Sequence, residues 1–128
     1  MIRNYRDLTR LEMEQVNKED TIVLIPLGAL EQHGNQAPLG TDDIIAEAMT
    51  EYIVKELDAE EPDFPMLLFP VIPVGLSTEH KNFCGSVTIK PDTYYHMLYD
   101  ISASLVHHGF KSWLSWCVTA EMRPLSRC

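Results

Sequence analysis

The sequence predicts an α/β protein built on a mainly parallel β-sheet. Three short apolar runs alternate with two longer segments in which apolar residues recur every three or four positions. Such alternation of strands and helices is typical of parallel sheets. The chain has 128 residues, of which 45% are hydrophobic, so it fits one domain and can form a core.

Each strand is predicted from a compact apolar run rich in branched residues. The runs span Thr21–Gly28, Met66–Val74 and Lys111–Val118, and a further short strand is predicted at Ser86–Ile89. Runs without polar alternation indicate strands that are buried on both faces, as in sheets covered by helices on each side.

The first two helices are predicted from capping signals and periodicity. Thr9 and Glu12 match a capping box, which predicts a short helix through Val16. The segment Asp42–Leu57 has the spacing of an amphipathic helix, and Thr41 is predicted to cap it.

A third helix is predicted to begin at Pro91, because proline suits the first helical turn. It should run to about His108 and end at Gly109. Its inner side is predicted to carry Tyr95, Leu98, Tyr99, Ile101, Ser102 and Leu105.

The charge balance narrows the class of partner. Ten basic residues stand against 19 acidic ones, which gives a formal net charge of -9. Nucleic acids and anionic membranes are bound by clustered Lys and Arg, so we expect neither as a partner. A small or neutral ligand, or a bound cation, suits this balance better.

The cysteines and the apolar runs indicate a cytoplasmic protein. Cys84, Cys117 and Cys128 are widely spaced and odd in number, so reduced thiols are the simplest interpretation. The N-terminus has no apolar stretch typical of a signal peptide. The longest mainly apolar run, Met66–Leu76, is too short to span a bilayer.

The loop after the first strand holds a candidate metal site, since ligands of open parallel sheets bind beyond the carboxyl ends of strands. Glu31 and His33 leave that strand two residues apart, and Asp42 follows at the start of the next helix. Two carboxylates and an imidazole suit a divalent cation such as Zn²⁺ or Mn²⁺, and a bridging Asp42 would allow two. Alternatively, Glu31 and His33 are solvated loop residues and Asp42 is only a helix cap.

The loop after the second strand holds Ser77, Glu79 and His80. Glu79 and His80 are predicted as catalytic residues that transfer protons or orient a substrate beside the metal, and Ser77 as a substrate-binding residue. The alternative is a hydrogen-bonded loop anchor that inserts Phe83 into the core.

Together the two loops resemble a known family. The segment PLGALEQHGNQAPLGTDDIIAEAM resembles the first signature of the creatininase (creatinine amidohydrolase) family, and GLSTEHKNFCGSVTI resembles the second. The resemblance covers roughly Asn4–Trp113 and corresponds to the N-terminal half of the family's domain. We therefore divide the chain into residues 1–114, the N-terminal part of such a domain, and an atypical tail at 115–128.

The resemblance implies a three-layer α/β/α fold, truncated here, and a divalent metal, Zn or Mn, with two ions in most members. It implies hydrolysis of a C–N bond in a cyclic or linear small-molecule amide. Glu31, His33 and Asp42 would be the metal ligands, with Asp42 as the bridge. Members are commonly homo-oligomers.

Four residues depart from the family pattern within the two loops. Asn35 and Gln36 replace a frequent Pro-His pair, Cys84 replaces the usual Pro, and Ser86 replaces the usual Thr. These departures spare the three predicted ligands and bear on substrate selection.

The tail departs more strongly, because the family carries Asn-Gly-His-Gly-Gly-Asn after the third strand and its His is a metal ligand. This chain reads LSWCVTAEMRPLSRC there. Codons that encode this tail can be read in a frame that starts two bases later. In that frame they permit Leu-Val-x-His-Gly-Gly-Asn-Ala, which suggests that the tail from about Ser115 is frameshifted.

Three functional hypotheses follow. The first is a metal-dependent amidohydrolase, and the second is a non-catalytic, truncated or frameshifted family member without the third-strand ligand. The third is an unrelated small α/β binding domain.

Overall fold

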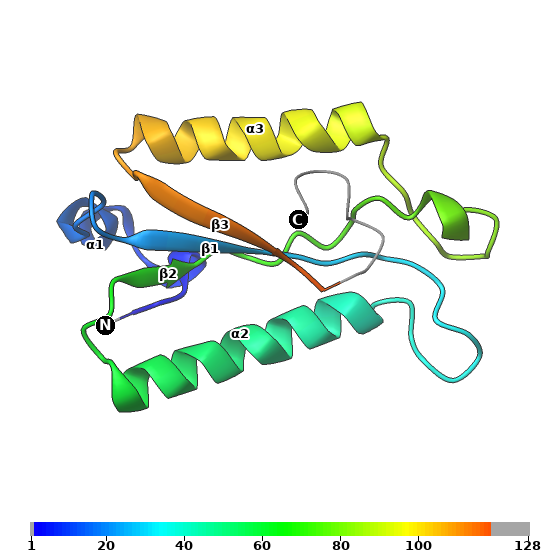
Figure 1. Cartoon of the computed structure of the whole chain (residues 1–128), viewed down its shortest axis with the longest axis horizontal. Coiled ribbons are helices and arrows are strands. Elements are labelled where there is room, and N and C mark those ends of the chain that lie inside the picture. The colour runs from blue at the N-terminus through cyan, green and yellow to red at the C-terminus, as the bar shows by residue number, and fades with distance from the viewer. Residues whose placement is uncertain (1, 119–128) are drawn as a thin grey trace.

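The structure is a computed structural model that describes residues 2–118, so most of the predicted tail lies outside the described residues. Its elements form three layers (Figure 1). Helix α3 (Pro91–His107) covers one face of the sheet and helix α2 (Thr41–Glu60) covers the other. The predicted α/β/α architecture is therefore confirmed.

The sheet has three parallel strands in the order β2-β1-β3. Strand β1 (Ile22–Leu27) lies in the centre and pairs with β2 (Met66–Leu68) on one side and β3 (Ser112–Cys117) on the other. Because every residue of β1 pairs with β3, the three residues 115–117 continue this strand. The boundary at 114/115 thus falls inside β3.

The core lies mainly between β1 and α3. Alternate residues of a strand point to opposite faces, and Val23, Ile25 and Leu27 of β1 form one buried cluster with Tyr94 and Leu105 of α3. Leu24 and Leu68 are also buried but lie outside that cluster, as expected for residues that point toward the α2 layer.

The predicted first helix is confirmed as α1 (Arg10–Gln15), which follows the 3-10 helix η1 (Tyr5–Asp7). Both hydrogen bonds of the capping box between Thr9 and Glu12 are present. The predicted cap of α2 is wrong, because Thr41 is the first helical residue and Gly40 precedes it as N-cap. The Thr41 hydroxyl instead donates a 2.6 Å hydrogen bond to the carbonyl oxygen of Pro38.

The bounds of α3 agree with the sequence, but the predicted inner face is partly wrong. Tyr94 is fully buried, whereas Tyr95 is 55% exposed and Tyr99 is 61% exposed. The core stripe passes through 94, 98, 101 and 105, in helical steps of three and four. Neighbouring residues of a helix point about 100° apart, so a core position that is predicted one residue too late falls on a side chain that points away from the core.

Strand β2 is much shorter than the predicted Met66–Val74. Pro70 and Pro73 have no N–H to donate and interrupt the ladder. The segment nevertheless stays beside β1, since the amide of Ile72 donates to the carbonyl oxygen of Pro26 at 3.0 Å. In place of the strand predicted at Ser86–Ile89 there are isolated bridges from Val87 to Leu30 and from Thr88 to Gly75.

Candidate metal centre

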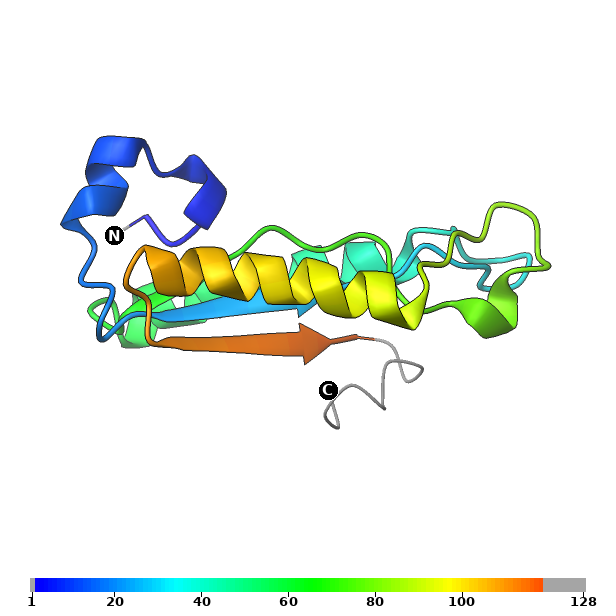
Figure 2. The same cartoon turned by 90° about the horizontal axis from the view of Figure 1, so that it is seen from above.

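The loop after β1 doubles back on itself at the carboxyl end of the sheet (Figures 1 and 2). The amide of Glu31 donates to the carbonyl oxygen of Leu39 at 3.2 Å, and His33 forms an antiparallel bridge with Ala37. Gly34 makes the turn between them with a φ of +74°, a conformation that glycine adopts without strain. The fold-back returns the chain to the start of α2.

As a result, the structure brings the three predicted metal ligands together. Glu31, His33 and Asp42 each offer one ligand atom, and these atoms lie within 4.8 Å of one another. The His33 Nε2 atom lies 3.5 Å from Oδ1 of Asp42. Both carboxylates are buried, at 4% exposure for Glu31 and 6% for Asp42.

The hydrogen bonding of His33 leaves one ring nitrogen available to a cation. Its Nδ1 lies 3.1 Å from the carbonyl oxygen of Glu31. A carbonyl oxygen can only accept, so Nδ1 carries the proton and Nε2 presents a lone pair in the neutral ring. A backbone carbonyl on the far nitrogen is the usual arrangement of a metal-binding histidine.

The carboxylates carry an electrostatic cost that a cation would offset. Burial raises the pKa of Asp42, the neighbouring Glu31 carboxylate raises it further, and His33 opposes this effect. Glu31 Oε2 and Asp42 Oδ2 are both buried without a hydrogen-bond partner among the described residues. Unpaired buried carboxylate oxygens are costly, and this donor set fits a divalent ion of the zinc or manganese type.

A further acidic residue, Asp43, lies at the start of α2, against the end of β1. Burial raises the pKa of Asp43 to about 6, Asp42 and Glu47 add to the rise, and a hydrogen bond from the backbone of Ala29 opposes it. The carboxylate lies directly over Gly28, where an added Cβ would lie 1.8 Å from Oδ1. Gly28 therefore permits the close approach of helix and strand that places Asp42.

The loop after β2 contributes its residues unevenly. Ser77 is fully buried and its Oγ has no hydrogen-bond partner among the described residues. His80 is partly buried, and its Nε2 lies 4.0 Å from Oε2 of Glu31. Glu79 is exposed, so its catalytic role stays a prediction. Phe83 is 55% exposed, and the loop anchor with Phe83 in the core is therefore wrong.

The sequence interpretation missed Gln32, which joins the two loops. Its backbone amide donates to Oγ of Ser86 at 3.0 Å, and its Nε2 lies 2.8 Å from Nδ1 of His80. The only sequence signal was its position between two predicted ligands, since its partner His80 is 48 residues away.

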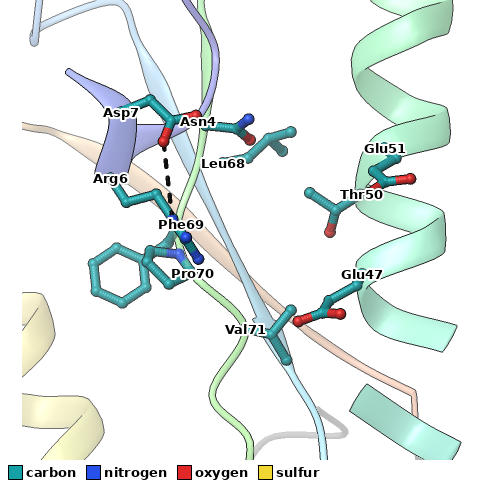
Figure 3. A pocket seen from close by; sticks show the side chains of 10 residues that line it. All are labelled: Asn4, Arg6, Asp7, Glu47, Thr50, Glu51, Leu68, Phe69, Pro70 and Val71. Atoms are coloured by element: carbon teal, nitrogen blue, oxygen red, sulfur yellow. Dashed lines mark ion pairs between the residues drawn. The ribbon is translucent and has the colours of Figure 1, made fainter. Parts of the chain in front are cut away.

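One pocket lies at the tips of the two loops and another lies beside η1. One, of about 480 Å³, lies at the loop tips and is lined by three departures from the family pattern, Asn35, Gln36 and Cys84. The other, of about 330 Å³, lies between η1, α2 and the segment after β2 (Figure 3). Arg6 and Asp7 form an ion pair at its rim, and the predicted site residues do not line it.

Fold and site together define an α/β protein with a candidate divalent-metal centre beyond its central strand. The family model described as creatininase, creatinine amidohydrolase, matches residues 6–115. The chain belongs to the creatininase family.

Curated relatives share this part of the chain. The mycofactocin precursor peptide peptidase of Mycobacterium tuberculosis is 37% identical over 87 residues, which are 64% of this chain and 34% of the relative. The creatinine amidohydrolase of Pseudomonas putida is 27% identical over 109 residues, which are 80% of this chain and 39% of the relative. The chain thus spans well under half the length of these relatives.

Solved structures share the fold. A creatininase described as the Mn form superposes with a TM-score of 0.76 at 21% identity, over 90% of this chain and 44% of that chain. A mutant creatininase of Zn-Zn type gives a TM-score of 0.75 at 22% identity, with the same shares covered. Within residues 2–118 we find no helix with the length and apolar character needed to cross a membrane.

Proposed function

We propose that this chain carries part of the active site of a metal-dependent amidohydrolase that cleaves the C–N bond of an amide. The observation that carries the proposal is the convergence of Glu31, His33 and Asp42, whose ligand atoms lie within 4.8 Å of one another. The unpaired buried oxygens of both carboxylates support it. The names of the curated relatives, a peptide peptidase and a creatinine amidohydrolase, support the reaction class.

In this proposal Glu31, His33 and Asp42 would hold the metal, and Asp42 would serve both ions where two are bound. A divalent cation there would polarise an amide carbonyl and lower the pKa of a water molecule. The Mn and Zn-Zn forms of the solved relatives make manganese and zinc the ions to test.

The second loop supplies the groups around the reacting amide. We propose that the Ser77 hydroxyl binds the substrate, because it is buried and has no hydrogen-bond partner among the described residues. Glu79 and His80 would orient the amide or transfer its protons. The loop-tip pocket, lined by Asn35, Gln36 and Cys84, would help to select among cyclic and linear amides.

A second candidate function is that of a non-catalytic family member. After Trp113 the sequence lacks the family's Asn-Gly-His-Gly-Gly-Asn stretch, which supplies a further ligand. Under this alternative Glu31, His33 and Asp42 bind metal weakly, and the chain turns over no substrate.

Metal binding tests the first step of the proposal. We expect the purified chain to bind Zn²⁺ or Mn²⁺ stoichiometrically, measured by calorimetry and by metal analysis after dialysis. Asp42→Asn should weaken the affinity by at least about tenfold, because even indirect changes to a metal site cost that much. The matched control is Asp92→Asn, which changes an exposed carboxylate in the first turn of α3. Unchanged metal content in a folded Asp42→Asn chain would refute the site.

Turnover separates the two candidates. The metal-loaded chain is assayed with creatinine and with a short peptide, and release of the hydrolysed product is followed by chromatography. Hydrolysis of either substrate that is lost in Asp42→Asn refutes the non-catalytic alternative. Weak metal binding without turnover refutes the enzymatic proposal for this chain.

A further inference from the structure

Two histidines lie at the candidate metal centre, and each has a defined partner at Nδ1. His33 meets the carbonyl oxygen of Glu31 at 3.1 Å, whereas His80 meets the side-chain nitrogen of Gln32 at 2.8 Å. The first partner can only accept a hydrogen bond and the second can only donate one. The two rings therefore face opposite requirements.

The orientation of the Gln32 amide is fixed independently of His80. The backbone N–H of Gly34 donates to Oε1 of Gln32 at 3.0 Å. A backbone N–H cannot accept, so the oxygen of the Gln32 amide must face Gly34 and its NH₂ group must face His80.

This orientation determines where the neutral His80 ring carries its proton. The NH₂ group of Gln32 donates to Nδ1 of His80, so Nδ1 is the acceptor and Nε2 carries the hydrogen. Nε2 in turn faces Oε2 of Glu31 at 4.0 Å, an oxygen that is buried and has no hydrogen-bond partner among the described residues. The Nε2–H group of His80 thus lies beside a predicted metal ligand, at a distance longer than a direct hydrogen bond.

His33 has the opposite tautomer, because its Nδ1–H donates to the carbonyl oxygen of Glu31. Its Nε2 keeps a lone pair, 3.5 Å from Oδ1 of Asp42. One ring therefore presents a lone pair at the centre and the other presents an N–H group. Hydrogen bonds to a ligating carboxylate orient that ligand and tune the metal.

We propose that Gln32 is a positioning residue that fixes His80 as the Nε2–H tautomer, so that His80 supports Glu31 while His33 binds the metal. The tautomer follows from the hydrogen bonds alone, and only its role toward the metal rests on the proposed function. Gln32 belongs to neither the predicted ligands nor the predicted catalytic residues.

The tautomers can be read directly by ¹⁵N NMR of the metal-free chain with labelled histidine. The spectra are recorded at about pH 9, where an ordinary imidazole, with a pKa of about 6.5, is neutral. We expect a pyrrole-type shift for Nε2 of His80 and for Nδ1 of His33, with signals assigned from His80→Asn and His33→Asn chains. A pyrrole-type Nδ1 in wild-type His80 would overturn the proposal, whether or not any variant folds.

A charge-changing variant tests the role of Gln32. In Gln32→Glu the carboxylate can still accept from Gly34 but can no longer donate, so His80 should switch to the Nδ1–H tautomer while His33 is unchanged. The matched control is Gln36→Glu, which adds the same charge at an exposed glutamine of the same loop. An Nε2–H tautomer retained in folded Gln32→Glu, or an equal switch in Gln36→Glu, would contradict the proposal.

The readout also separates this inference from the proposed function. The NMR samples contain no metal, and the spectra do not depend on turnover. The expected tautomers would therefore support the role of Gln32 even in a chain that binds no metal. Conversely, stoichiometric metal binding together with an Nδ1–H tautomer at His80 would refute this inference alone.

Discussion

The two loops at the carboxyl end of the sheet hold similar residue types but differ in how firmly they are placed. The first leaves β1, the central strand, which is paired along its length with β3 and also with β2. The second leaves β2, an edge strand of three residues. Glu31 and Asp42 of the first loop region are buried, whereas Glu79 of the second is exposed. A loop anchored on a central strand can hold charged groups together that an edge-strand loop leaves in solvent.

The largest expected effect distinguishes the histidines of the two loops. His33→Ala should weaken zinc affinity by at least about a hundredfold, because it removes a proposed ligand. His80→Ala should weaken it by about tenfold, since its ring acts through Glu31. Competition titration with a chromogenic chelator measures both affinities. The control is His96→Ala, which changes an exposed histidine of α3. Equal losses for His33 and His80 would mean that both rings bind the metal.

The next effect concerns the base of the first loop. Gly28→Ala should destabilise the chain by about 1–3 kcal/mol, because the new Cβ forces Asp43 away from β1. In an Asp43→Ala background the same substitution should cost less, since the contact at 1.8 Å is gone. Urea unfolding of the four chains gives the coupling energy. If the destabilising effects of Gly28→Ala and Asp43→Ala simply add, contact with Asp43 is not the reason that alanine at position 28 destabilises the chain.

The corresponding glycine of the second loop should behave differently. Gly85 has a φ of +89°, and an added Cβ would meet the flexible end of Leu39 at 2.5 Å. Gly85→Ala should cost about 1–2 kcal/mol, mainly from the backbone conformation. The cost should therefore persist in a Leu39→Ala background, unlike the Gly28 case. If Leu39→Ala relieves it in urea unfolding, side-chain contact and not backbone strain is the cause.

The smallest effect is expected at Ser77. Ser77→Ala removes a buried hydroxyl that has no hydrogen-bond partner among the described residues, so stability should stay equal or rise by up to about 1 kcal/mol. Thr88→Val is the contrasting variant, because Thr88 Oγ1 accepts from the Ser77 amide at 2.9 Å. That change should lower stability by about 1 kcal/mol. A clear loss of stability in Ser77→Ala would contradict the unpaired hydroxyl.

Much of the fold could be predicted because its signals are local. The capping box of Thr9 and Glu12 lies within one helical turn, and the apolar run of β1 is continuous along the chain. The predicted ligands were also accessible to sequence reasoning, since Glu31, His33 and Asp42 lie within one loop and the start of one helix. Their meeting needs only the short fold-back at Gly34.

Features that depend on distant contacts could not be predicted in the same way. The choice of Tyr94 over Tyr95 as the buried tyrosine is set by the rotation of α3 against β1, which a periodic pattern of apolar residues leaves ambiguous by one position. The shortening of β2 depends on how the segment with Pro70 and Pro73 can still pair with β1.

The sequence by itself determined the order of strands and helices, the capping of α1 and the residue types of a cation site, because each depends on neighbours along the chain. Only the tertiary structure decided that Asp43 would lie over Gly28 and that Gln32 would join His80 across 48 residues. The contact between Gln32 and His80 exists because parallel strands end at one edge of the sheet and bring separate loops into hydrogen-bonding distance. The tautomer of His80 follows from that packing, since the fold places Gln32 at its Nδ1, whereas the Nδ1 partner of His33 is the carbonyl oxygen of Glu31 in the same loop.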